Sequence, residues 1–298
     1  MDTSGVILLV LLLGTLNTVQ CQYEVSKSED FEGSSPIDDI PEEEKYTVSA
    51  LIERANKNAG QELDDPEIIE GDIAVDTGFQ NAAPCTSRRH RNCKWYRSKD
   101  GRVYVPYVIS SQYSSREKAI IVKAMNSFAN ATCVRFRPRK RRRSKDRDYL
   151  YIKSKRGCWS YVGRRGRRQI VSLARRGCVY HQVIQHELLH ALGFHHEQAR
   201  SDRDMHVRIL YENIKQGKKR NFKKIKTNNM DTPYDYGSVM HYSRSVMHYS
   251  RYAFSRNRQP TIVPIPDANV AIGRATQMSS WDIARINRLY GCEAPVLV

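Results

Sequence analysis

One eleven-residue segment constrains this chain more than any other. Residues 186–196 read HELLHALGFHH. Residues four apart lie on one face of an α-helix, so His186 and His190 can direct two imidazoles at one ion. Gly193 can end the helix in the left-handed conformation, and the chain can then turn to bring His196 to a third position. Three imidazoles hold zinc with one position left open, so we expect one Zn2+ per chain.

The glutamate that follows the first histidine predicts the reaction. Glu187 is rotated by about 100° from His186, so its carboxylate can lie beside the ion without binding it. Zinc lowers the pKa of water to about 7, and a carboxylate can accept the proton as that water attacks a peptide carbonyl. The alternative is an ordinary core helix with an apolar face. The fixed positions of the motif have a chance probability of roughly one in three million per start, which favours a metal site.

The rest of the chain predicts a mixture of strands and helices. Strands are expected at 103–109, kinked at Pro106, and at 149–152 and 169–173, and helices at 46–58, 114–129, 180–192 and 279–290. The last helix is expected to bury Trp281, Ile283, Ile286 and Leu289. Because the elements do not alternate regularly, we assign the α+β class.

Charge and hydropathy divide the chain into three parts. Val6–Leu13 (VILLVLLL) has signal-peptide length, so we expect a signal peptide at 1–21. Residues 22–80 carry 17 acidic against 4 basic side chains, whereas residues 81–298 carry 45 basic against 14 acidic ones. We interpret 22–80 as an activation propeptide and 81–298 as the catalytic domain. No second apolar stretch has membrane length, so we expect a secreted protein without a membrane anchor, stored in secretory granules before release.

The continuation of the motif resembles one peptidase family. The extended histidine pattern is similar to that of metzincins. Within that group, residues 193–204 (GFHHEQARSDRD) resemble the astacin family. Ser238–Tyr242 (SVMHY) resembles the Met-turn of that family and the tyrosine that follows it. The resemblance covers about Glu70 to Cys292. It implies an N-terminal mixed sheet with two long helices, a more irregular C-terminal subdomain, and a zinc cleft between them.

The resemblance also implies roles for individual residues. It gives His186, His190 and His196 as zinc ligands, Glu187 as base, Met240 as the floor beneath the ion, Tyr242 as the donor to the oxyanion, and Glu197 as the partner of the amine that activation creates. It pairs Cys133 with Cys292 and Cys158 with Cys178, and a Cys85–Cys93 pair resembles the extra loop of six-cysteine fish hatching enzymes. The remaining histidines (His90, His181, His195, His206 and His241) are interpreted as structural or surface residues.

Two further features qualify this picture. Ile69–Asp72 (IEGD) resembles the Phe-x-Gly-Asp segment with which astacin precursors block zinc, so Asp72 is the expected blocking residue; the alternative is a plain turn. Ser238–Arg244 is repeated without change as Ser245–Arg251, so Met247 and Tyr249 compete with Met240 and Tyr242. We favour the first copy, because its separation from His196 is typical of the family. The alternative explanation of the repeat is an error of sequencing or assembly.

These features predict a secreted zinc endopeptidase, made as a zymogen and monomeric, that digests egg-envelope or extracellular-matrix protein. The alternatives are a paralogue acting in another secretory tissue and a polyanion-binding protein with impaired catalysis. Runs such as Arg135–Arg147 favour retention on acidic glycans or matrix, against the alternative of a solvated surface; we expect no nucleic-acid partner. Asn130 begins an Asn-Ala-Thr glycosylation sequon.

Overall fold

A seven-stranded sheet forms the centre of the structure. The computed structural model describes residues 46–61, 65–75, 93–140, 146–242, 254–257 and 259–292. The strand order is β1-β2-β6-β7-β5-β3-β4. The strands are β1 (Glu67–Ile69), β2 (Ile73–Val75), β3 (Val103–Ile109), β4 (Val134–Pro138), β5 (Tyr149–Lys153), β6 (Cys158–Ser160) and β7 (Arg168–Leu173). Parallel and antiparallel neighbours coexist, which confirms the expected mixed sheet.

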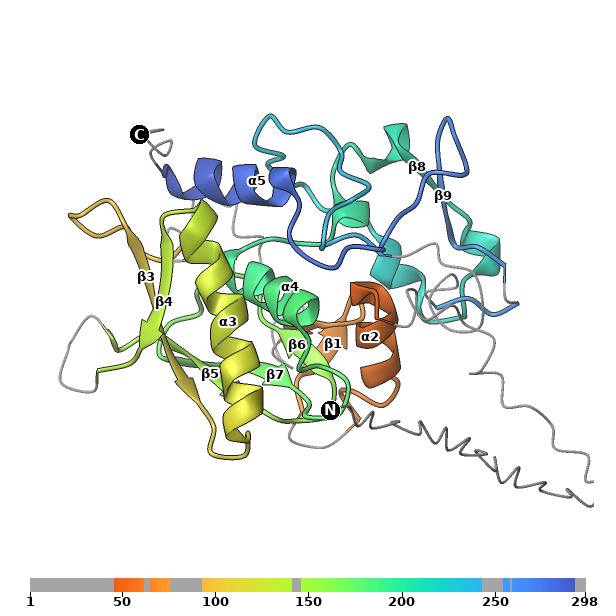
Figure 1. Cartoon of the computed structure of the whole chain (residues 1–298). Coiled ribbons are helices and arrows are strands. Elements are labelled where there is room, and N and C mark those ends of the chain that lie inside the picture. The colour runs from red at the N-terminus through yellow and green to blue at the C-terminus, as the bar shows by residue number, and fades with distance from the viewer. Residues whose placement is uncertain are drawn as a thin grey trace, which may run out of the picture. The chain divides into compact units, whose positions relative to one another are not determined.

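Two long helices cover one face of this sheet. The helices α3 (Ser115–Ala131) and α4 (His181–Leu192) contact each other, and α3 contacts β4 while α4 contacts β6 and β7 (Figure 1). Ser114 and Glu117 form the capping box that starts α3. The buried side chains of α3 recur at helical spacing: Ile121, Ala124, Met125 and Phe128. This spacing explains why the segment is a helix with one face in the core.

The strand β3 runs without interruption through Pro106. Its first five residues pair with β4, where Pro106 lies opposite Arg137, and its last three pair with β5. Strand pairing therefore continues on both sides of the proline, at the place where the sequence predicted a kink.

The C-terminal part has little regular structure, as the resemblance implied. It contains the short hairpin of β8 (Val207–Ile209) with β9 (Ile262–Pro264) and the 3-10 turns η2 (Glu197–Ala199), η3 (Arg203–Met205), η4 (Tyr211–Asn213) and η5 (Lys219–Phe222). The helix α5 (Ser280–Tyr290) ends the described chain. No helix among the described residues is long and apolar enough to cross a membrane.

The buried face of α5 differs from the prediction at Trp281. Trp281 is 38% exposed, and the buried residues are Asp282, Arg285, Ile286 and Tyr290. The prediction for Trp281 was wrong because two polar side chains face inward. Asp282 accepts hydrogen bonds from the Ser238 hydroxyl and the Val239 N–H. Apolar periodicity cannot detect a helix face that is buried by such contacts.

Two disulfides join distant parts of the chain. Cys133 at the start of β4 is bonded to Cys292 after α5, and Cys158 of β6 is bonded to Cys178 before α4. These are the two pairs that the resemblance implied. Cys85 lies outside the described residues, so the pairing of Cys85 with Cys93 stays a prediction.

The helix α2 (Val48–Ala55) and the β1–β2 hairpin belong to the acidic segment 22–80, which is called the leader from here on. Val48, Leu51 and Ile52 of α2 are buried in the same core cluster as α3 and α4. The hairpin joins the sheet where Ile73 of β2 pairs in parallel with Ser160 of β6. The leader therefore supplies both a helix and an edge of the sheet.

Candidate metal centre

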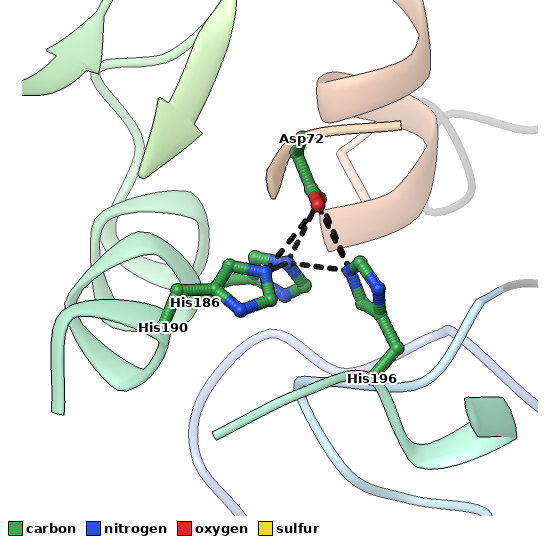
Figure 2. A group of neighbouring side chains, drawn as sticks. All are labelled: Asp72, His186, His190 and His196. Carbon is green, nitrogen blue, oxygen red and sulfur yellow. Dashed lines mark hydrogen bonds and ion pairs between the residues drawn. The ribbon is translucent and has the colours of Figure 1, made fainter. Parts of the chain in front are cut away.

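Three histidines and one aspartate converge on a common point (Figure 2). His186 and His190 lie one turn apart on α4. Gly193 ends this helix at φ 114°, and the chain then returns to place His196 beside them. The Nε2 atoms of His190 and His196 lie 3.1 and 3.3 Å from Nε2 of His186. All four side chains are buried.

Asp72 places its carboxylate between the three rings. Oδ2 lies 3.0 Å from Nε2 of His186 and 3.2 Å from Nε2 of His196, and Oδ1 lies 3.4 Å from Nε2 of His190. One donor atom from each of the four residues falls within 4.8 Å of the others. Burial opposes the ionisation of Asp72, but the neighbouring histidines hold its pKa well below the usual value.

The other ring nitrogens fix the orientation of the histidines. Nδ1 of His186 lies 2.7 Å from the carbonyl oxygen of Val239, and Nδ1 of His190 lies 2.7 Å from that of Phe194. A carbonyl can only accept, so Nδ1 carries the proton and Nε2 presents its lone pair to the centre. Nδ1 of His196 lies 3.1 Å from the Glu70 carboxylate. Burial lowers the pKa of His190 to about 4, which favours the neutral imidazole that a metal requires.

This donor set fits zinc. Three imidazole nitrogens and one carboxylate oxygen are ligands of the type that tetrahedral zinc takes in proteins. Asp72 Oδ1 is buried and accepts no hydrogen bond from the described residues, as expected of an atom that a cation would satisfy. Both carboxylate oxygens of Glu187 are also buried, and neither has a hydrogen-bond partner in the part of the chain that the structure describes. Burial, and then the charge of Asp72, raise the pKa of Glu187 well above its usual value.

The first copy of the repeated segment lies beside this cluster. Met240 is 3% exposed and belongs to the main core cluster. The ring centroid of Tyr242 lies 4.7 Å from that of His196, and the Tyr242 hydroxyl donates to the carbonyl of Glu70. The alternatives Met247 and Tyr249 lie outside the described residues. The choice between the two copies therefore stays a prediction.

The turn that carries Asp72 is held by residues that the sequence did not single out. The side-chain amide of Asn56, at the C-terminus of α2, donates to the carbonyls of Gly71 and Cys158, and its oxygen accepts from the Cys158 N–H. The N–H of Glu70 donates to the side chain of Asn221. Gly71 has φ +85°, and a Cβ there would lie 3.1 Å from the Tyr242 hydroxyl. This close approach explains the glycine before Asp72.

Glu197 lies in a buried charge network beside a cavity. Its carboxylate accepts from Arg285 at 2.7 and 2.8 Å and from Arg200 at 3.2 Å. The cavity has a volume of about 360 Å³ and is lined by Glu197, His196 and Met240 among others. The amine that the resemblance assigns to Glu197 is not among these contacts, so that role stays a prediction.

The other predicted positions are distributed as follows. His241 is buried, and its Nε2 accepts from the Tyr234 hydroxyl at 2.8 Å, so this histidine is structural as expected. His195 lies 3.7 Å from the Glu70 carboxylate. Asn130 is exposed on α3, one residue before the helix ends, and its glycosylation stays a prediction. His90 lies outside the described residues.

Comparison with known proteins agrees with this geometry. The family model of astacin, a family of peptidases, matches residues 89–245 and 243–291. This chain belongs to the astacin family. The two matched ranges overlap at residues 243–245, inside the repeated segment. A family model with a single Met-turn would be divided in this way by a second copy. The chain is therefore a zinc metalloendopeptidase with the metzincin fold.

Similar proteins include hatching enzymes of one fish. The low choriolytic enzyme of Oryzias latipes is 44% identical over 286 residues, which cover 96% of this chain and 97% of that protein. High choriolytic enzyme 1 of the same species is 46% identical over 245 residues, 82% of this chain and 84% of that one. Its solved structure, described as a hatching enzyme zinc-protease, matches with a TM-score of 0.62 at 50% identity, covering 67% of this chain and 96% of that chain.

Proposed function

We propose that this chain is a secreted zymogen whose leader closes the zinc site, and that the processed enzyme digests egg-envelope protein at hatching. The observation that carries the proposal is the position of Asp72. It precedes His186 by 114 residues in the chain, yet its carboxylate lies 3.0 Å from the His186 ring. A carboxylate at this point occupies the position that a catalytic water needs.

The chain's own residues suit peptide hydrolysis once the leader has left. Zinc held by His186, His190 and His196 would supply an acidified water and polarise the substrate carbonyl. Glu187 accepts the proton of the attacking water and passes it to the leaving amine. The Tyr242 hydroxyl donates to the oxygen on which negative charge develops.

The leader blocks the histidine cluster, the Tyr242 hydroxyl and the edge of β6 at the same time. Asp72 covers the histidine cluster, and its charge adds to the burial that raises the pKa of Glu187, which favours the protonated carboxyl. The carbonyl of Glu70 occupies the Tyr242 hydroxyl. The strand β2 occupies the edge of β6, where an extended peptide could pair. Removal of residues 22–80 would release the cluster, the tyrosine and the strand edge together.

The body is suited to receive a new N-terminus. We place the mature start at or near Asn81, and the amine that forms there would enter the cavity beside Glu197. Asp235 and Asp282 are buried nearby and share hydrogen bonds or ion pairs with this network. The ion pairs of Arg200 and Arg285 involve three carboxylates, those of Glu197, Asp202 and Asp282, so the formal charges of this network leave one negative charge for an added amine.

The substrate assignment rests on the choriolytic names of the relatives. Those proteins are named for digesting an egg envelope, and we propose the same substrate class for a monomeric, granule-stored form of this chain. A paralogue in another secretory tissue would carry the same residues. Expression in embryonic hatching-gland cells, rather than in adult tissue alone, is the outcome that supports the hatching role.

The full chain provides the test. Secreted precursor should leave isolated egg envelopes intact, and processing should yield an N-terminus at or near Asn81 and digest them. The matched control is processed Glu187→Gln, which should bind zinc and leave the envelope undigested. If zinc-loaded, processed wild-type protein cleaves neither peptides nor envelopes, the protease assignment fails and a polyanion-binding protein becomes the better description.

A further inference from the structure

The segment that builds most of the sheet carries a large excess of positive charge. Residues 93–176 contain 25 Lys and Arg against four Asp and Glu. Three of these acids already pair with an arginine: Asp146 with Arg137, Asp148 with Arg164, and Glu117 with Arg175. The four acids can neutralise few of the cations in this segment, and peptide hydrolysis requires none of the remainder.

Part of this charge lies on the sheet face opposite the helices. Side chains alternate between the two faces of a strand. On one face, Val105, Val134, Leu150, Ile152 and Val171 are fully buried in the core with α3 and α4. The strand register aligns the alternate residues on the other face, where Tyr149 lies opposite Arg168. We call the following residues the Arg–Tyr face: Tyr104, Arg137, Arg139, Tyr149, Tyr151, Lys153 and Arg168.

Arginines on this face are stacked on tyrosine rings. The guanidinium carbon of Arg139 lies 3.9 Å from the ring centroid of Tyr149. Those of Arg137 and Arg168 lie 5.5 and 5.8 Å from the rings of Tyr104 and Tyr151. These distances are within the range of cation–π attraction, about 6 Å. Arg137 also donates both terminal nitrogens to Asp146. Stacking holds the guanidinium groups of Arg139 and Arg168 by the flat side, so less side-chain entropy is lost when N–H groups at their edges bind an anion.

Arginine also predominates over lysine here. Residues 93–176 contain 17 Arg and 8 Lys, whereas residues 215–226, another basic segment, contain one Arg and 6 Lys. The planar fork of arginine donates two parallel hydrogen bonds to an oxyanion such as sulfate, which lysine cannot do. A surface that served only solubility would have no need of this choice. The tyrosine rings of this face are half-buried, and the apolar faces of sugar rings can pack against their exposed parts.

We propose that the Arg–Tyr face binds a sulfated polysaccharide. This function is separate from proteolysis, because the face lies on the opposite side of the sheet from α4 and its histidines. Polysaccharide binding would retain the secreted enzyme near its substrate, and only this purpose rests on the proposed function. An acidic polypeptide is the other polyanion that such a surface could meet, and the test distinguishes the two.

The test compares two triple variants of the full chain with equal charge loss. One combines Arg139→Gln, Lys153→Gln and Arg168→Gln on the face. The control combines Lys215→Gln, Lys219→Gln and Lys223→Gln, which are exposed lysines of the other basic segment. Heparin affinity is measured across a series of salt concentrations. Each lost contact with a polyanion lowers the slope of log affinity against log salt by about one, so the face variant should lose about three and the control almost none.

Three results would overturn the proposal. The first is an equal loss of heparin affinity in the two triple variants, which would mean that binding depends only on net charge. The second is wild-type retention on heparin no stronger than on a plain sulfonate exchanger. The third is tighter binding to immobilised polyglutamate than to heparin.

A single Arg168→Lys variant, which keeps the charge and removes the planar guanidinium, should lose part of the heparin affinity. Peptide cleavage by the processed triple variants should equal that of wild type, so failure here leaves the protease assignment untouched.

Discussion

Asn56 is the residue whose replacement tests the leader's mode of inhibition most directly. Its amide makes hydrogen bonds of 2.9 Å to Gly71 and of 2.6 Å to both the carbonyl and the N–H of Cys158. It thereby links α2, the turn that contains Asp72, and the strand β6. Asn56→Ala removes all three contacts and touches none of the expected catalytic residues.

The expected size of the effect follows from these bonds. A hydrogen bond in a folded protein contributes about 1 kcal/mol net, so the two bonds between Asn56 and Cys158, which join the leader to the body, contribute about 2 kcal/mol to the closed state. Since 1.4 kcal/mol corresponds to a factor of ten, the fraction of precursor with an open cleft should rise about 30-fold.

The assay is the residual peptide cleavage of precursor whose leader is shown by intact mass to be uncut. This residual rate is proportional to the open fraction while that fraction is small, so the ratio between variant and wild type reports the change directly. The matched control is Asn58→Ala, an exposed asparagine in the same turn, which should leave the rate unchanged. Equal rates for the two variants would refute the role of Asn56 as the tie between leader and body.

Three further predictions concern the catalytic groups. Glu187→Gln should lower peptide turnover by about 10²–10⁴-fold with zinc content unchanged by elemental analysis, and parallel loss of zinc would contradict its role as base. Tyr242→Phe should lower kcat about 10²–10³-fold in processed enzyme while Tyr249→Phe has little effect, and the reverse pattern would assign the second copy of the repeat. Chelation of the processed enzyme should abolish peptide cleavage and added Zn2+ should restore it; activity that survives verified removal of zinc would refute the metal assignment.

The metal ligands were predictable because their geometry is local. His186 and His190 are separated by one helical turn, and Gly193 ends that helix as a glycine in this position predicts. The strand β7 and the helix α3 were likewise indicated by short-range periodicity and, for α3, by a capping box. In each case the deciding interactions lie within a few residues of one another.

The features that sequence reasoning missed depend on contacts across long separations. Asn56 meets Cys158 over 102 residues, and the carboxylate of Glu70 meets His196 over 126 residues. Neither residue type is unusual at its position, so no local signal distinguishes it. The error at Trp281 has the same origin, because the inward turn of α5 is set by Glu197 and Ser238 in other segments.

The connections of α5 impose an order on biosynthesis. Asp282 accepts a hydrogen bond from the Val239 N–H, and the carbonyl of Val239 accepts one from His186 and so orients that ring. Arg285 holds Glu197, one residue after His196, and Cys292 after the helix is bonded to Cys133. A ribosome-bound chain that has not yet released residues 280–292 therefore lacks the support of its first and third histidines. Zinc uptake should accordingly be among the last events of folding, after translation of the leader that will cover the site has long been completed.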